Sequence, residues 1–310
     1  MLSDERTPSH PGAIGIALFV TVLWSSSWVL IRWGLDGEGL RPISFAALRY
    51  GLAALLVIAW MLVREPRVGS TIRRMSRPMI LRIVALGVLM YALTQGAQFV
   101  AIANQPAATT SLVLSWTPLL VAGLAAVSLS ELPARRQIAG AVLVVVGAWA
   151  YFAGDLGFTR VGMAAAFVGL GAGVAASLLG RGINRTRQLS PVIVTALSMT
   201  IGSAILVVVG FAAEGVPEVS AKAWLIIVWL AVVNGAFAFT LWNRSLQRLS
   251  AVESAGINNT MLIQIAALAW LFLDETPGIA EVAGIALVSI GVFLTQMSGA
   301  RVGRRTTGLP

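Results

Sequence analysis

The sequence predicts an all-α integral membrane protein: ten transmembrane helices in two inverted-topology five-helix repeats, with both termini cytoplasmic. Three observations support this fold class. The 310 residues are 57% hydrophobic and 11% charged, whereas an ordinary soluble domain is about 25% charged. Apolar stretches of membrane-spanning length follow one another along the whole chain. A short motif near position 131 returns near position 275.

The membrane spans come first, because a helix needs about 20 apolar residues to cross the hydrocarbon core of a bilayer. Segments of this kind are predicted at 13–34, 43–63, 79–103, 107–128, 136–153, 161–180, 190–212, 222–243, 252–273 and 278–297. The longest connection is 64–78, so no sizeable extramembrane domain is expected. The first repeat covers 13–154 and the second 155–297. An N-terminal tail, 1–12, and a basic C-terminal tail, 298–310, complete the chain.

The distribution of arginine predicts the orientation, because cytoplasmic loops carry an excess of Lys and Arg. Seventeen arginines lie in the two tails, in 64–78 with the adjoining Arg82, and in the alternate loops that share their side. The other side has Arg41, Arg160 and Lys222, with Arg32 close to it. Both termini are therefore expected in the cytoplasm, in a bacterial-type inner membrane. Membrane lipids are expected partners, and the basic loops serve mainly to set the topology.

The recurring motif explains the two repeats. Four residue pairs are each 144 positions apart: Glu131 and Glu275, Pro133 and Pro277, Gly140 and Gly284, Gly147 and Gly291. They fall at the fourth-to-fifth and ninth-to-tenth helix junctions, so the repeat unit is five helices. An odd number of spans inverts the second copy, which is the arrangement that supports alternating access. Because the glycines in each copy are two turns apart on one face, we interpret them as helix-packing residues.

Several motifs in the same order resemble the EamA family of the drug/metabolite transporter superfamily. They are WSSSW at 24–28, the pair Arg49–Tyr50, and the segments AIANQPAATTSLVLSWTPLL at 101–120 and LQRLSAVESAGINNTMLI at 246–263. More narrowly, the chain is similar to exporters of aromatic amino acids and methyl viologen. The resemblance covers essentially the whole chain and implies passage of small organic molecules from the cytoplasm. It does not fix the substrate.

Candidate substrate-binding residues are aromatic and polar side chains near the middle of the spans, where ligand sites of such transporters lie. Tyr91, Gln95 and Gln98 have helical spacing, which predicts one shared polar face. Polar groups at this depth are expected to face protein or water; interhelical hydrogen bonding is the alternative for each. The full set is Trp24, Ser27, Trp28, Tyr91, Gln95, Gln98, Trp116, Asn234 and Asn258.

A second set has expected gating or structural roles. Arg49 is about six residues, or roughly 9 Å, from the outer face. Arginine can extend to the interface over that distance, so a structural or gating role ranks above substrate binding. Pro118 would interrupt helical hydrogen bonding and permit a bend. The set is Arg49, Tyr50, Pro118, Asn259 and Glu253.

Absent residue types exclude several functions. There is no cysteine and one histidine, His10, which argues against metal sites and imidazole catalysis. No Asp or Glu lies near the middle of a predicted span, and no phosphate-binding Gly-rich loop is present. The sequence therefore predicts no enzyme activity, no cofactor and no nucleic-acid partner. It also predicts facilitated, uncoupled transport, because proton-coupled carriers commonly use an intramembrane carboxylate or histidine.

The predicted function is export of small amphipathic metabolites, with aromatic and other neutral amino acids as substrates, by alternating access. One alternative is a nucleotide-sugar or phosphorylated-metabolite exchanger, which would need fixed positive charge in its cavity. A second alternative is a membrane scaffold that transports nothing. The physiological substrate and the oligomeric state stay open, and a monomer is compatible with the sequence.

Overall fold

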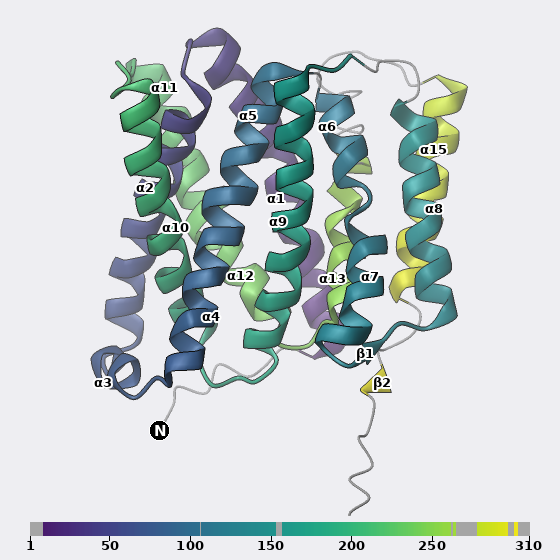
Figure 1. The fold of residues 1–310 in the computed structure, drawn as a ribbon, viewed down its shortest axis with the longest axis horizontal. Helices are drawn as coiled ribbons and strands as arrows, with labels where there is room; N and C mark the ends of the chain where they lie inside the picture. The colour runs from purple at the N-terminus through teal and green to yellow at the C-terminus, as the bar shows by residue number, and fades with distance from the viewer. Residues whose placement is uncertain are drawn as a thin grey trace, which may run out of the picture.

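A computed structural model describes residues 9–105, 107–152, 157–261, 263–264, 278–296 and 301–302. The described residues are mostly helical (84%), and the helices run nearly side by side (Figure 1). Within the described residues, six helices are long and apolar enough to cross a membrane: His10–Gly37, Pro42–Arg64, Arg77–Asn104, Arg160–Asn184, Pro191–Glu214 and Ala221–Ser245. Two shorter apolar helices are Leu112–Ser128 and Val282–Thr295.

In the described residues, the first half of the chain contains eight α-helices and two π-helical segments. They are α1 (His10–Arg32) with η1 (Trp33–Gly37), α2 (Pro42–Arg64), α3 (Val68–Arg73), α4 (Arg77–Gly87), η2 (Val88–Gln95), α5 (Gly96–Asn104), α6 (Ala107–Leu114), α7 (Thr117–Ser128) and α8 (Arg135–Phe152). The short helix α3 lies in the loop 64–78, where no helix was expected. The predicted span 107–128 is interrupted between α6 and α7, directly before Pro118.

The second half follows the same plan. Its helices are α9 (Arg160–Asn184), α10 (Pro191–Glu214), α11 (Ala221–Trp229), η3 (Leu230–Phe237), α12 (Ala238–Ser245), α13 (Ala251–Asn258) and α15 (Ile279–Gln296). The ninth predicted span, 252–273, begins with α13, and its part beyond 264 lies outside the described residues, as do Glu275 and Pro277. The π-helical segments η2 and η3 interrupt the third and eighth spans at comparable positions.

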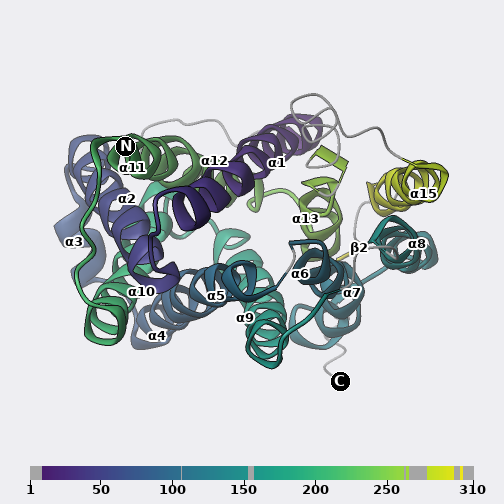
Figure 2. The same cartoon turned by 90° about the horizontal axis from the view of Figure 1, so that it is seen from above.

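Helices α8 and α15 form a pair at one end of the molecule (Figure 2). A Cβ atom added to Gly140 would lie 2.5 Å from the backbone oxygen of Gly291, and one added to Gly291 would lie 2.6 Å from the oxygen of Gly140. Gly147 and Gly284 face each other in the same way. Gly140, near the start of α8, contacts Gly291 near the end of α15, and Gly147, further along α8, contacts Gly284 near the start of α15. The two helices therefore run antiparallel with their backbones in contact.

The outer surface of the helices is apolar. Large side chains there are more than half exposed: Leu55, Leu62, Val127, Val208, Leu225 and Phe293. They come from five different helices, so apolar exposure extends around the molecule. Soluble monomers rarely expose apolar surface this widely, and the pattern is that of a multi-pass membrane protein.

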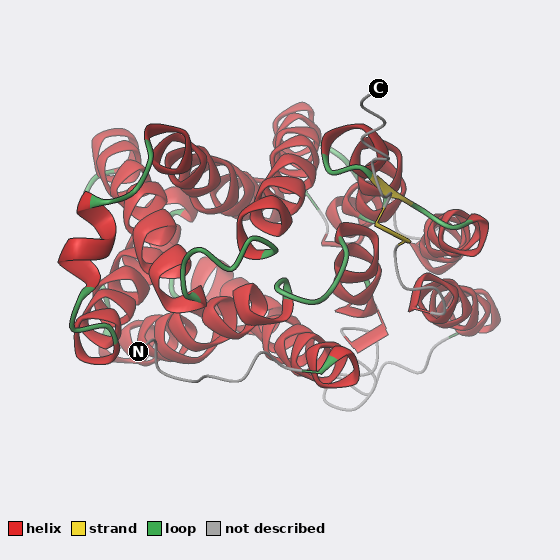
Figure 3. Ribbon diagram, turned by 90° about the horizontal axis from the view of Figure 1, so that it is seen from below, coloured by secondary structure: helices red, strands yellow, loops and turns green. Residues whose placement is uncertain are grey.

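One end of the molecule carries a small β pairing and the loop helix α3 (Figures 1 and 3). Strand β1 (Glu131–Leu132) pairs antiparallel with β2 (Arg301–Val302). Neither strand was expected from the sequence. The start of α1 is at this end as well, since His10 contacts Glu253 at the start of α13.

Candidate substrate-binding site

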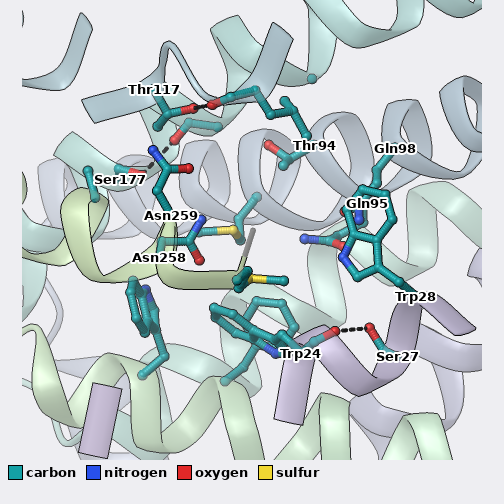
Figure 4. A pocket seen from close by; sticks show the side chains of 18 of the residues that line it. Trp24, Ser27, Trp28, Thr94, Gln95, Gln98, Thr117, Ser177, Asn258 and Asn259 are labelled. Carbon is teal, nitrogen blue, oxygen red and sulfur yellow. Dashed lines mark hydrogen bonds between the residues drawn. The ribbon is translucent and has the colours of Figure 1, made fainter. Parts of the chain in front are cut away.

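A cavity of about 160 Å³ lies between the two halves of the chain. Its wall is built from α1, α2, η2 with α5, the α6–α7 junction, α9, α12 and α13 (Figure 4). A water molecule needs about 10–15 Å³, so the cavity can hold a molecule considerably larger than water.

Six of the nine predicted substrate-binding residues lie in this wall: Trp24, Ser27, Trp28, Gln95, Gln98 and Asn258. Three residues with expected gating or structural roles join them: Arg49, Tyr50 and Asn259. The amide pairs Gln95/Gln98 and Asn258/Asn259 stand on opposite sides of the cavity, with Trp24 between them along the lower edge (Figure 4). Sequence positions more than 160 residues apart therefore meet here.

Aromatic rings form one side of the wall. The ring of Trp24 lies 4.8 Å from that of Phe239 and 5.1 Å from that of Trp242, measured between centroids. Sequence reasoning missed Phe239 and Trp242. The repeat itself held the signal, because these residues are 144 positions after Gln95 and Gln98. At these two equivalent positions the first copy of the repeat has amides and the second has aromatic rings.

The polar groups of the wall are partly fixed by hydrogen bonds. The Tyr50 hydroxyl donates to Oε1 of Gln95 at 2.6 Å. Thr94 donates to the backbone oxygen of Leu89, five residues earlier, at 2.7 Å, within the π-helical turn η2. π-Helical turns inside helices occur frequently at functional sites. Here η2 carries Thr94 and Gln95 to the cavity.

Three predicted binding residues lie away from the cavity wall. Tyr91 is buried behind it, with its ring 5.0 Å from that of Phe239. Trp116 is 39% exposed at the α6–α7 break. Asn234 is fully buried and joins η3 to α1: its amide donates to the backbone oxygen of Leu23, and its own backbone oxygen accepts from Trp24.

The Tyr91 result has a physical reason. The shared face predicted for Tyr91, Gln95 and Gln98 assumes 3.6 residues per turn. Residues 88–95 are π-helical, and a π-helical turn advances by i→i+5 hydrogen bonds. The altered turn changes the angles among the three side chains, so a spacing of 3.6 residues per turn does not describe this face.

The acids near one end of the helices make structural contacts. Glu131 accepts hydrogen bonds from Nε of Arg181 at 2.9 Å and from the backbone nitrogen of Ala251 at 3.1 Å. It therefore ties the end of the first repeat to two helices of the second. Glu253 forms a capping box with Ser250 and contacts Nε2 of His10 at 3.0 Å, which holds the start of α13.

Pro118 lies in the first turn of α7, where a missing backbone N–H costs least. The described residues contain no group of three or more His, Asp or Glu side chains able to hold a metal ion.

The fold and the cavity define a helical, multi-pass membrane protein with an internal site for a small molecule. The chain belongs to the EamA-like transporter family, which matches residues 11–153 and again 163–297. It is thus a small-molecule transporter of the drug/metabolite transporter superfamily.

Two curated relatives are similar over nearly their whole length. One, from Streptantibioticus cattleyicolor, is named "Probable terminal-alkyne amino-acid exporter" and is 29% identical over 306 residues, covering 96% of this chain and 95% of the relative. The other, from Salmonella typhimurium, is named "Probable amino-acid metabolite efflux pump" and is 25% identical, covering 94% and 96%. A solved crystal structure with 20% identity has a TM-score of 0.74 and covers 92% of this chain and 96% of that one; it shows the shared fold.

Proposed function

We propose that this protein exports neutral amino acids, aromatic ones included, from the cytoplasm across a bacterial inner membrane. The observation that carries the proposal is the cavity between the two halves, with aromatic rings on one side and four amides around it. This combination suits a small amphipathic molecule. The names of the two relatives, an amino-acid exporter and an amino-acid metabolite efflux pump, support the same substrate class.

Transport proceeds by alternating access of two inverted five-helix repeats, 13–154 and 155–297, with ten spans and cytoplasmic termini. The antiparallel pairing of α8 with α15 through equivalent glycines supports the inversion. So does the occurrence of η2 and η3 in the third and eighth spans. The end that carries α3, β1 and β2 is cytoplasmic, because most of the arginines belong to that side.

The Glu131–Arg181 ion pair closes this cytoplasmic end. It joins β1 of the first repeat to α9 of the second at 2.9 Å, so an inward-facing state requires its rupture. Glu253 holds the adjoining start of α13. The transporter would thus exchange two packings of the same helices around a fixed site.

Transport is facilitated rather than proton-coupled. Among the described residues that line the cavity, none is Asp, Glu or His. The buried acids Glu131 and Glu253 are engaged in structural contacts at one end. A site without a carboxylate or histidine lacks the group that commonly links proton and substrate movement.

The test is flux of labelled leucine, phenylalanine, tryptophan and glutamate into proteoliposomes, with and without an imposed pH gradient. Saturable flux of the neutral amino acids that leaves their equilibrium level unchanged by the gradient is the expected result. Accumulation above equilibrium driven by the pH gradient alone would refute uncoupled transport. Flux of none of them would refute the amino-acid substrate.

A further inference from the structure

The cavity wall contains one buried cation, Arg49, which is 3% exposed. Its Nε has no hydrogen-bond partner in the described part of the chain. Nor does any carboxylate among those residues pair with its guanidinium within 4.0 Å. The guanidinium carbon lies 4.8 Å from the ring centre of Tyr50 and 5.9 Å from that of Phe99. Buried charges in proteins are normally paired, so an unpaired guanidinium at a cavity wall indicates an anionic ligand.

A second hydrogen-bond donor stands close to Arg49. Tyr50, the next residue in α2, donates its hydroxyl proton to Oε1 of Gln95 at 2.6 Å. Because the amide oxygen of Gln95 accepts this bond, the other terminal atom of the side chain is the amide nitrogen, which is a donor. Nε2 of Gln95 donates to none of the described residues and belongs to the cavity wall. Arg49 and Gln95 both contact Tyr50, so α2 and η2 each place a donor residue in the same part of the wall.

Among the described residues of the wall, Arg49 is the one with a formal charge. The others are aromatic, aliphatic, methionine, hydroxyl, amide or glycine residues. The described part of the wall therefore carries a charge of +1, which attracts a carboxylate and disfavours a cation. The amides of Asn258 and Asn259 lie across the cavity from Gln95 (Figure 4). Their oxygens, together with the faces of the tryptophan rings, suit the ammonium group of a zwitterion.

We propose that Arg49 binds the carboxylate of the transported molecule, with Nε2 of Gln95 as a second donor. The cavity then selects carboxylate-bearing molecules over cations and over uncharged analogues of the same shape. This inference rests on the proposed transport of amino acids and specifies how the site recognises them. It replaces the gating or structural role expected for Arg49 from the sequence. It also argues against dications such as methyl viologen as substrates, although the narrower resemblance includes them.

The test compares three ligands of similar shape: leucine, leucinamide, which lacks the carboxylate, and 4-methylpentanoate, which lacks the amine. Each is titrated against the purified full-length protein, and affinity is obtained from the ligand-dependent rise in Tm. The variants are Arg49→Gln and Arg49→Lys. The matched control is Arg82→Gln, which removes an exposed arginine of α4 outside the cavity wall.

The wild type is expected to bind leucine at least roughly 30-fold more tightly than leucinamide, because losing one partner of a buried charge pair is costly. In Arg49→Gln this ratio falls to about one, in Arg49→Lys it is intermediate, and in Arg82→Gln it is unchanged. A ratio near one in the wild type overturns the proposal. An unchanged ratio in Arg49→Gln, or in Arg49→Lys should the glutamine variant not fold, also overturns it.

The third ligand, 4-methylpentanoate, distinguishes failure of the Arg49 carboxylate site from failure of the proposed amino-acid transport. If 4-methylpentanoate binds in an Arg49-dependent manner and leucine does not, the carboxylate site stands and amino-acid transport falls. If leucine and leucinamide bind the wild type equally, amino-acid transport stands and the carboxylate site falls. Binding of neither carboxylate would overturn both.

Discussion

The α8–α15 contact gives a sharp prediction for Gly147→Ala. A Cβ atom at this position would lie 2.7 Å from the backbone nitrogen of Val288 and 2.8 Å from the backbone oxygen of Gly284. Ordinary van der Waals contact for such an atom is 3.4–4 Å, so the helices would have to separate by about half an ångström or more. Both obstacles are backbone atoms of α15, which cannot turn aside as a side chain can.

Two opposing terms determine the magnitude. Replacing glycine by alanine in a helix interior stabilises by about 0.5–1 kcal/mol. Overpacking a tight contact costs about 1–3 kcal/mol, and the direct backbone collision makes the upper part of that range apply. The net expected effect is a loss of about 1–2 kcal/mol. Gly171→Ala in α9 is the matched control, because nothing lies within 4 Å of a Cβ atom there, and it should stabilise.

The assay is thermal unfolding of the purified Gly147→Ala and Gly171→Ala variants in the same detergent. A further variant, at the facing glycine of α15, is measured in the same way. Gly284→Ala meets the backbone of Gly147 and Tyr151 at 2.6 Å, so it should destabilise alone. In the double variant the second substitution should cost less than the first, because the helices are already apart. If Gly147→Ala raised the Tm as Gly171→Ala does, the close packing of α8 and α15 would be refuted.

Three further predictions concern Asn234, Glu131 and the pair Trp24 and Trp116. Asn234→Ala should lower stability by about 0.6–1.7 kcal/mol, as loss of a helix-joining hydrogen bond does in membranes, and leave the KM of flux unchanged; a raised KM at unchanged Tm would instead make Asn234 a substrate ligand. Glu131→Gln should lower the stability of the fold by about 3 kcal/mol, because Arg181 keeps a buried charge; adding Arg181→Gln should restore part of the loss in thermal unfolding, and strict additivity would contradict the pairing. Trp116→Leu should leave flux within about twofold of the wild type, whereas Trp24→Leu should reduce it at least tenfold by removing the ring at the cavity edge; equal effects of the two would contradict the assignment.

Much of the helical framework could be predicted from the sequence because bilayer thickness sets helix length. Helices α2 and α10 begin at Pro42 and Pro191, as the preference of proline for the first helical turn predicts. The packing of Gly140 against α15 follows from the spacing of small residues. These features can be predicted because each depends only on the local pattern of residue types along the chain.

The π-helical turns could not be predicted in the same way. Residues 88–95 and 230–237 have apolar composition like that of the α-helical spans around them, so nothing local marks the change of turn. Gln95 lines the cavity while Tyr91 lies behind it, and spacing counted at 3.6 residues per turn does not distinguish the two. Predictions of shared faces therefore fail where the helix changes its period.

The side that a buried polar residue faces is also set by tertiary packing. Asn234 and Asn258 are similar amides in apolar spans, yet one joins helices and the other lines the cavity. Arg49 could extend to the interface only if its helix face met lipid; the face instead meets Phe99 and the cavity. The repeat offset of 144 would have found Phe239 and Trp242.

The central claim is that the cavity is the substrate's path, and two glycines of α9 test it directly. Gly173 lies in the wall, with only Thr94 near its absent side chain at 3.6 Å, while Gly171 has nothing within 4 Å and is outside the wall. Flux of the best amino-acid substrate is measured in proteoliposomes containing Gly173→Leu or Gly171→Leu at matched Tm. The cavity path predicts loss of flux in Gly173→Leu and near wild-type flux in Gly171→Leu. Equal flux in both variants would contradict it.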